Sequence, residues 1–190
     1  MEQKRFDPSK LDRLNAPERI KNFPVLEIMD QLQLNNPQLV VDLGAGTAFY
    51  SIPIAEKFKD CKVIATDISD IMIEWMKEHV IPYFPNIQTL KMLDHTLDIP
   101  DQSVDFLFMV NLHHELDSPE LTLQESYRVI KNIGYIAISD WRKEPSEKGP
   151  SFELRYETEK VIDQLISNGF QLVSCQTDYP DNFVIIGKKI

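Results

Sequence analysis

Along most of the chain, the pattern of apolar and polar positions predicts strands that alternate with helices. Segments with apolar residues three and four apart, the spacing of a helix with one buried face, occupy 49–58, 70–80 and 118–131, and Gly134 is expected to close the last of them. Short apolar runs favour buried strands at 38–43, 61–67, 87–93, 104–110 and 135–140. Such alternation is typical of a mostly parallel sheet with helices on its faces.

The C-terminal part of the sequence breaks this alternation. After an expected helix at 157–168, two apolar runs at 170–178 and 182–190 are separated by only three residues. A link this short cannot make a parallel crossover, so we expect an antiparallel pair. The pattern therefore predicts an α/β fold with a seven-stranded, mostly parallel sheet whose last strand is antiparallel.

The N-terminal region has a helical pattern without a place in that sheet. Residues 9–35 are expected to be helical, with Pro17 in a first turn and a kink or split at Pro24. We therefore expect residues 1–37 to form a helical cap over a core of residues 38–190, the whole chain being one domain.

The sequence VVDLGAGTAFYS, residues 40–51, leads from a buried strand into a glycine turn. Gly44 and Gly46 allow a ligand to approach the backbone closely, and a helix is expected to begin at Phe49. Asp67 ends the next strand about 20 residues later, the distance at which an acid binds ribose hydroxyls. This predicts a site for a dinucleotide or for S-adenosylmethionine. The alternative is a tight turn with Asp67 as a helix cap.

Two features favour S-adenosylmethionine over a dinucleotide. A dinucleotide turn usually has glycine where this chain has Phe49, whose ring would press on the pyrophosphate, whereas S-adenosylmethionine has no phosphate. The antiparallel pair of strands at the C-terminus also argues against a dinucleotide domain.

The chain resembles the class I S-adenosylmethionine-dependent methyltransferases, in particular the type 11 group related to ubiquinone and menaquinone biosynthesis. The resemblance covers residues 38–190, and its order and spacing of motifs are more specific than any one motif. The motifs are VVDLGAGTAFYS, VIATDIS, LDHTLDIPDQSVDFLFMVNLHHEL and ESYRVIKNIGYIAISDW. It implies a Rossmann-like three-layer sandwich, S-adenosyl-L-methionine as cofactor and methyl transfer to a small-molecule acceptor.

The resemblance also implies a role for individual residues. Ala48 departs from the family, which usually has a third glycine there, and this change narrows the turn or weakens binding. Phe6, Lys10 and Tyr50 are further candidates to reach the pocket. The implied contacts are Asp42, Gly44, Ala45 and Gly46 with the methionine end, Asp67 with the ribose, Ile68 with the adenine ring, Asp94 with the adenine amino group and His95 beside it, and Asn111 near the sulfonium.

A general base is optional in this chemistry, because the methyl group on a sulfonium is already activated. A base, if present, is expected in the segment NLHHELDS, where His113 or His114 would orient or deprotonate the acceptor. The alternative is a pair of loop histidines bonded to backbone or water. No metal site is expected, because neighbouring residues in a loop lack preset geometry. Residues 142–156 form either a lid or a solvated connection.

Composition narrows the range of binding partners and locations that we expect. A net charge of −10 disfavours nucleic acid, and no apolar run approaches the length of a membrane span. Two distant cysteines and an N-terminus without an apolar segment favour a cytoplasmic protein. Oligomeric state stays open. The rival functions are a non-catalytic S-adenosylmethionine-binding module and an NAD-dependent oxidoreductase; a protein or RNA methyltransferase is a weaker alternative.

Overall fold

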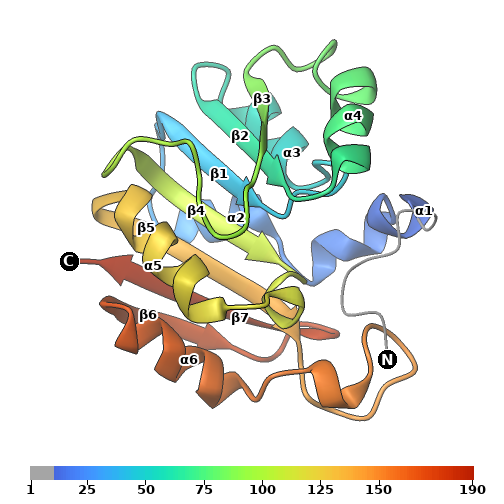
Figure 1. The fold of residues 1–190 in the computed structure, drawn as a ribbon, viewed down its shortest axis with the longest axis vertical. Coiled ribbons are helices and arrows are strands. Elements are labelled where there is room, and N and C mark those ends of the chain that lie inside the picture. Colours follow the sequence, from blue (N-terminus) through green and yellow to red (C-terminus); the bar gives the residue numbers. More distant parts are fainter. Residues whose placement is uncertain (1–10) are drawn as a thin grey trace.

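The structure is a computed structural model that describes residues 11–190, so Phe6 and Lys10 lie outside the described residues. Within this range, seven strands form one sheet in the order β3-β2-β1-β4-β5-β7-β6 (Figure 1). The strands are β1 Leu39–Leu43, β2 Lys62–Asp67, β3 Ile87–Lys91, β4 Val104–Val110, β5 Ile130–Trp141, β6 Phe170–Gln176 and β7 Asn182–Lys189. The α/β fold predicted from the sequence is confirmed.

The direction of the strands fixes where a ligand can bind. Strands β1 to β5 pair in parallel, and β7 runs antiparallel to its neighbours β5 and β6, as predicted. Strand β1 lies between β2 and β4, so the order of strands reverses there. In open α/β sheets, ligands bind at the carboxyl ends of the strands beside such a reversal.

Helices cover both faces of the sheet and make three layers. Alternate residues of one strand face opposite layers: Phe106 and Phe108 of β4 belong to one apolar core, and Leu107 and Met109 to the other. The first core is closed by α2 (Val25–Gln31), α3 (Ser51–Lys57) and α4 (Asp70–His79). The second is closed by α5 (Pro119–Val129) and α6 (Thr158–Ser167).

The N-terminal cap is more broken than its helical pattern predicts. In place of helix with a single interruption at Pro24, it consists of α1 (Leu11–Leu14), a 3₁₀ helix (Pro17–Lys21) and α2. Each proline stands at or just before the start of a segment, where its missing N–H costs no helical hydrogen bond. The cap is therefore a chain of short segments that depends on contacts with the core.

The role predicted for Gly134 is wrong. Helix α5 ends at Val129 and β5 begins at once, so Gly134 lies inside a strand. The pairing of β4 with β5 shifts register at this point. A Cβ at residue 134 would lie 3.1 Å from the carbonyl oxygen of Asp105, so glycine permits the close approach of the two strands at this bulge.

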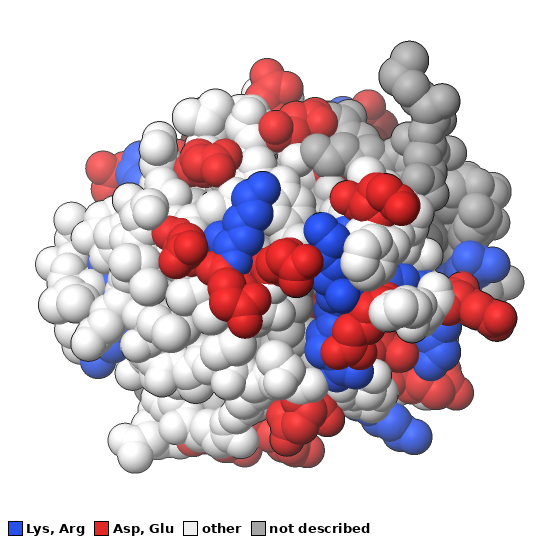
Figure 2. All heavy atoms as spheres, turned by 90° about the horizontal axis from the view of Figure 1, so that it is seen from below, with Lys and Arg blue, Asp and Glu red and all other residues white. Residues whose placement is uncertain are grey.

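The surface carries charges of both signs. On the face shown in Figure 2, Lys and Arg side chains lie next to Asp and Glu, without a continuous basic area. Among the described helices, none has the length and apolar character needed to cross a membrane.

Candidate functional site

The glycine turn directly follows β1. Gly44 and Gly46 have φ angles of +72° and +57°, a conformation that favours glycine. A Cβ on Gly44 would lie 2.7 Å from a methyl carbon of Leu112, so this position has a steric requirement as well. The N–H of Ala45 donates to the carbonyl oxygen of Thr66 on β2 (2.8 Å), which ties the turn to the neighbouring strand. The structure thus gives this turn a fixed shape.

Asp67 at the end of β2 lies against the same turn. Its Oδ2 accepts a hydrogen bond from the N–H of Gly46 (2.9 Å), and its Oδ1 accepts one from the N–H of Ser69 (2.9 Å). Burial raises the pKa of Asp67, although these backbone donors lower it. A carboxylate oxygen has two lone pairs, so each oxygen can still accept a ligand hydroxyl. Ile68 beside it is 37% exposed and offers an apolar surface.

Asp42 and Tyr50 lie behind the turn, in the interior. Asp42 accepts a hydrogen bond from Ser51 Oγ (2.8 Å), and burial raises its pKa to about 7. The hydroxyl of Tyr50 donates to the carbonyl oxygen of Arg19 (2.9 Å), and burial raises the pKa of Tyr50 to about 12. Tyr50 therefore fastens the cap to the turn.

Asn111 follows β4, on the other side of β1. Its N–H donates to the carbonyl oxygen of Ser139 (2.8 Å), and its Oδ1 accepts a hydrogen bond from Asn182 Nδ2 (2.7 Å). Asn111 has a φ of +56°, which directs the chain away from the strand. The next residue is Leu112, which covers Gly44. Asn111 is thus brought close to the glycine turn.

Asp94 and His95 follow strand β3. They form a turn between Leu93 and Thr96, which pair with each other, and Asp94 has a φ of +50°. The N–H of Met92 just before them donates to the carbonyl oxygen of Asp67 (3.0 Å). The segment after β3 is therefore attached at Asp67.

His113 and His114 point to different partners. His113 is fully buried; its Nε2 donates to Gln164 Oε1 on α6 (2.9 Å), and its ring meets Tyr156 edge-on. Burial lowers the pKa of His113. Its Nδ1 has no hydrogen-bond partner among the described residues. His113 thus faces the helical layer that contains α6.

His114 instead forms a buried pair with the end of β5. Its Nδ1 donates to Asp140 Oδ1 (2.8 Å), and its backbone N–H donates to Asp140 Oδ2 (2.9 Å). Burial alone would lower the pKa of His114, but the charge and hydrogen bond of Asp140 outweigh it, so the pKa is raised. Its Nε2 lies 3.8 Å from Glu115 Oε1.

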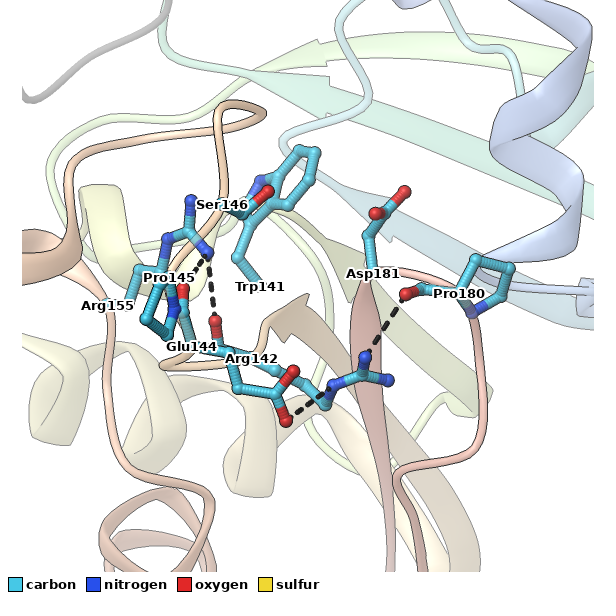
Figure 3. Close-up of a pocket in the computed structure, with 8 residues that line it drawn as sticks. All are labelled: Trp141, Arg142, Glu144, Pro145, Ser146, Arg155, Pro180 and Asp181. Carbon is cyan, nitrogen blue, oxygen red and sulfur yellow. Dashed lines mark hydrogen bonds and ion pairs between the residues drawn. The ribbon is translucent and has the colours of Figure 1, made fainter.

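A cavity of about 190 Å³ lies at the carboxyl end of β5. Figure 3 shows the indole of Trp141 and the carboxylate of Asp181 on the same side of Arg142. The Asp181 carboxylate accepts from Lys148 Nζ (3.2 Å) and Asn22 Nδ2 (3.3 Å), joining the 142–156 segment to the cap. The cavity is lined by Trp141, Arg142, Glu144, Pro145, Ser146, Arg155, Pro180 and Asp181.

Arg155 organises the segment 142–156, a role that no sequence pattern predicts. The buried guanidinium donates to the carbonyl oxygens of Arg142 (3.1 Å), Glu144 (3.0 Å), Pro150 (2.9 Å) and Lys148. It lies 5.7 Å from the centroid of the Trp141 ring. Because one guanidinium binds these carbonyl oxygens, the polar segment 142–156 is an ordered loop. Leu112, Asn182 and Arg19 are further contacts of the site that sequence analysis missed, because each depends on residues distant in the chain.

Comparison with known proteins decides between the cofactors. A model of the methyltransferase domain family matches residues 40–134, half of the chain and the part that contains the glycine turn, Asp67 and Asn111. The chain belongs to this family. A crystal structure of a SAM-dependent methyltransferase from Aquifex aeolicus superposes on this chain with a TM-score of 0.90 and 31% sequence identity. The match covers 98% of this chain and 100% of that one.

Two curated relatives match shorter parts of the methyltransferase. Malonyl-[acyl-carrier protein] O-methyltransferase 1 of Coxiella burnetii is 31% identical over 60% of this chain, and prostaglandin reductase 1 of Bos taurus is 28% identical over 61% of it. The chain spans only 37% and 35% of their lengths. The predicted membership of the class I, type 11 kind of methyltransferases is confirmed.

S-adenosyl-L-methionine is the cofactor of this family, and the residues of the site fit it. Gly44 and Gly46 give the turn a left-handed backbone without side chains, Asp67 keeps lone pairs for hydroxyl groups, and Ile68 exposes an apolar surface next to them. A nucleoside requires these three properties together.

Proposed function

We propose that this methyltransferase transfers the methyl group of S-adenosyl-L-methionine to a small-molecule acceptor by direct in-line displacement. The cavity at the end of β5 is the observation that supports a small acceptor. Its volume of about 190 Å³ suits a compact molecule. Asn182 begins the strand beside the cavity and donates to Asn111, the residue proposed to lie near the sulfonium.

The cofactor supplies an activated methyl group, so the chain mainly has to hold two reactants in line and exclude water. We assign Asp67 to the ribose hydroxyls, Ile68 to the adenine ring, Asp94 to the adenine amino group with His95 beside it, and Asn111 to the sulfonium region. Asp42, Gly44, Ala45 and Gly46 are assigned to the methionine end, with Tyr50 fixing the cap beside it.

His114 is the better placed of the two histidines to act on an acceptor. Asp140 accepts the Nδ1 hydrogen, so Nε2 of the neutral ring keeps a lone pair that can orient the acceptor or take its proton, and the raised pKa of His114 makes Nε2 a stronger base. His113 is bonded to Gln164 in the helical layer, and we assign it a structural role. Acceptors that are neutral and unprotonated need neither histidine.

Other properties complete the proposal. A net charge of −10 and the mixed charges in Figure 2 support an acceptor other than nucleic acid. The unpaired cysteines, Cys61 and Cys175, support a reducing, cytoplasmic location. The alternative is a module that binds S-adenosylmethionine without catalysis, and the reductase among the relatives keeps an oxidoreductase as a less favoured candidate.

A labelling experiment tests the acceptor. Cell extract is separated into low-molecular-mass, protein and RNA fractions, and each is incubated with enzyme and S-adenosylmethionine labelled in the methyl group. We expect label in the low-molecular-mass fraction, lost with Ser146→Trp, which fills the cavity, and kept with Ser167→Trp at the exposed end of α6. Label in protein or RNA would contradict the proposal. Cofactor binding without any transfer would favour the non-catalytic module.

A further inference from the structure

An amide side chain is buried where β4, β5 and β7 meet at the edge of the sheet that carries the site. Asn182 begins β7 and pairs in register with Trp141 at the end of β5, so it lies at the carboxyl ends of the parallel strands. Its Nδ2 donates to Asn111 Oδ1 (2.7 Å) and to Ser139 Oγ (2.9 Å). Asn182 and Ser139 are fully buried. Asn111, Ser139 and Asn182 therefore form one polar triad.

The amide oxygen of Asn182 has no hydrogen-bond donor among the described residues. Both N–H groups of its Nδ2 are used within the polar triad, whereas its Oδ1 has no partner there or elsewhere in the described range. A buried carbonyl without a donor costs free energy, and most buried polar atoms of native proteins are paired. A ligand that donates a hydrogen bond to Asn182 would remove this cost.

The polar triad connects the cofactor side of the site with the acceptor cavity. Asn111, proposed to lie near the sulfonium, has a φ of +56°, and costly backbone conformations of this kind are concentrated at functional sites. Asp181 and Trp141, the chain neighbour and the register partner of Asn182, line the cavity (Figure 3). An acceptor that reaches Asn182 from this cavity would have its reacting atom next to Asn111.

We propose that Asn182 Oδ1 accepts a hydrogen bond from the reacting group of the methyl acceptor, and that this group is a neutral primary or secondary amine. This inference rests on the proposed function, because it names the acceptor of the same methyl transfer. An amine whose N–H is bound by Asn182 keeps its lone pair free to attack the methyl carbon. Burial favours the neutral form of an amine, which is the form that reacts.

An amine fits Asn182 better than a carboxylate or a hydroxyl group does. A carboxylate has no proton to donate to Oδ1. A hydroxyl group has to lose its proton to a base when it is methylated, and an amide oxygen is not a base. His114 is bonded to Asp140, whose side chain points to the opposite face of β5 from that of Ser139, the partner of Asn182.

Methylation of an amine needs no base in the transfer step. The nitrogen lone pair forms the bond to the methyl carbon while the carbon–sulfur bond breaks, and the electron pair of that bond stays on sulfur. The product is an ammonium ion, which keeps its protons until it loses one to water. The negative end of the Asn182 carbonyl dipole stabilises the positive charge that develops on the nitrogen.

Removing amines from the acceptor pool tests the substrate class. The low-molecular-mass fraction of cell extract is divided, and one half is treated with unlabelled formaldehyde and cyanoborohydride, which convert primary and secondary amines to tertiary amines and leave hydroxyl and carboxyl groups intact. Both halves then receive enzyme and S-adenosylmethionine labelled in the methyl group. We expect label in the untreated half and loss of most of it in the treated half.

Two results of this experiment would overturn the inference while the proposed function stands. One is label that persists after the amines are converted. The other is label that base releases as methanol, which identifies a methyl ester. If neither half of the fraction takes up label, the inference and the proposed function are both overturned.

The variant Asn182→Leu tests the residue. The rate of label transfer should fall about ten- to a hundredfold, while affinity for S-adenosylhomocysteine in calorimetric titration stays within about threefold, because the lost contact is with the acceptor. Asn182→Asp keeps an oxygen at this position and should retain more of the rate. Asn36→Leu, before β1 at the opposite edge of the sheet, is the control and should match the wild type. An unchanged rate, or equal losses of rate and affinity, for Asn182→Leu would show that Asn182 does not hold the acceptor.

Discussion

The left-handed backbone of the glycine turn is shared between two kinds of residue. Gly44 and Gly46 adopt it without strain, whereas the buried Ala48 adopts it with a φ of +58°. A non-glycine residue in this conformation carries a cost of about 1–2 kcal/mol. The turn therefore retains strain at one position, and that position can be tested directly.

Replacing Ala48 by glycine should leave both stability and cofactor affinity nearly unchanged. Relief of the left-handed strain, about 1–2 kcal/mol, is offset by the loss of a buried methyl and by the greater freedom of glycine in the unfolded chain. Urea unfolding and titration with S-adenosylhomocysteine measure the two effects. A loss of more than about tenfold in affinity would show that the turn is built around the methyl group.

Asp67→Asn should weaken binding of S-adenosylhomocysteine by about ten- to a hundredfold, or 1–3 kcal/mol, because the ribose hydroxyls lose a charged acceptor. Titration calorimetry measures the change, and circular dichroism checks that the fold remains. Asp70→Asn is the control, since Asp70 is exposed and paired with Lys91 on the surface. Equal affinities of the Asp67 variant and the wild type would remove Asp67 from the site.

The two adjacent histidines should affect stability with opposite dependence on pH. The pKa of His114 is raised, so its contribution is complete below about pH 6.5 and is lost as pH rises through the raised value. The pKa of His113 is lowered, so the folded state loses stability as pH falls below about 6.5. Unfolding of His113→Gln and His114→Gln in urea across this range, with exposed His79→Gln as control, measures both slopes. Equal slopes would contradict the assignment.

At the residue scale, the spacing of residues along the sequence predicted the features that depend on local structure, namely the glycine turn and Asp67. The turn and Asp67 follow strands whose ends must meet at one edge of a parallel sheet, and Gly46 does contact Asp67. The directions of His113 and His114 could not be predicted, because they depend on Gln164 and Asp140, which are distant in the chain. Arg19 was missed for the same reason.

At the scale of elements, the periodicity of apolar residues predicted the strands between helices. The structure of the cap and the role of Gly134 depend instead on contacts with other parts of the chain. The strands between helices were predicted because buried runs and turns are local signals. The cap divides into short segments whose order depends on Tyr50 and on the bonds between Asn22 and Asp181. Gly134 resembled a helix stop, but the bulge between β4 and β5 requires it.

Arg155→Met should release the loop 142–156. The variant loses hydrogen bonds from a charged group to four carbonyl oxygens, and bonds of this kind contribute about 1.5–3 kcal/mol each, although not additively. We expect new protease cleavage within the loop and a loss of stability of at least about 2 kcal/mol. Limited proteolysis with mapping of the cut sites measures it, with Lys77→Met on α4 as control. A loop as resistant as that of the wild type would contradict this role.

At the scale of the whole molecule, the sheet order places the turn after β1 next to the ends of β2 and β4, and the cap contacts this region through Leu14 and Arg19. Asp67, Asn111 and Tyr50, from three parts of the chain, lie at the turn. The loop 142–156 is connected to this region because it binds Asp181, whose neighbour Asn182 binds Asn111. The family match assigns the cofactor of this edge, and the cavity beyond it supports a small acceptor.

The most direct test of this account is calorimetric titration of the protein with S-adenosylmethionine, S-adenosylhomocysteine and NAD. The account predicts that the first two bind, each at one site, and that NAD does not, because Phe49 stands where a dinucleotide turn needs glycine. Binding of NAD in place of the other two would contradict it and would assign the turn at Gly44–Gly46 to a dinucleotide.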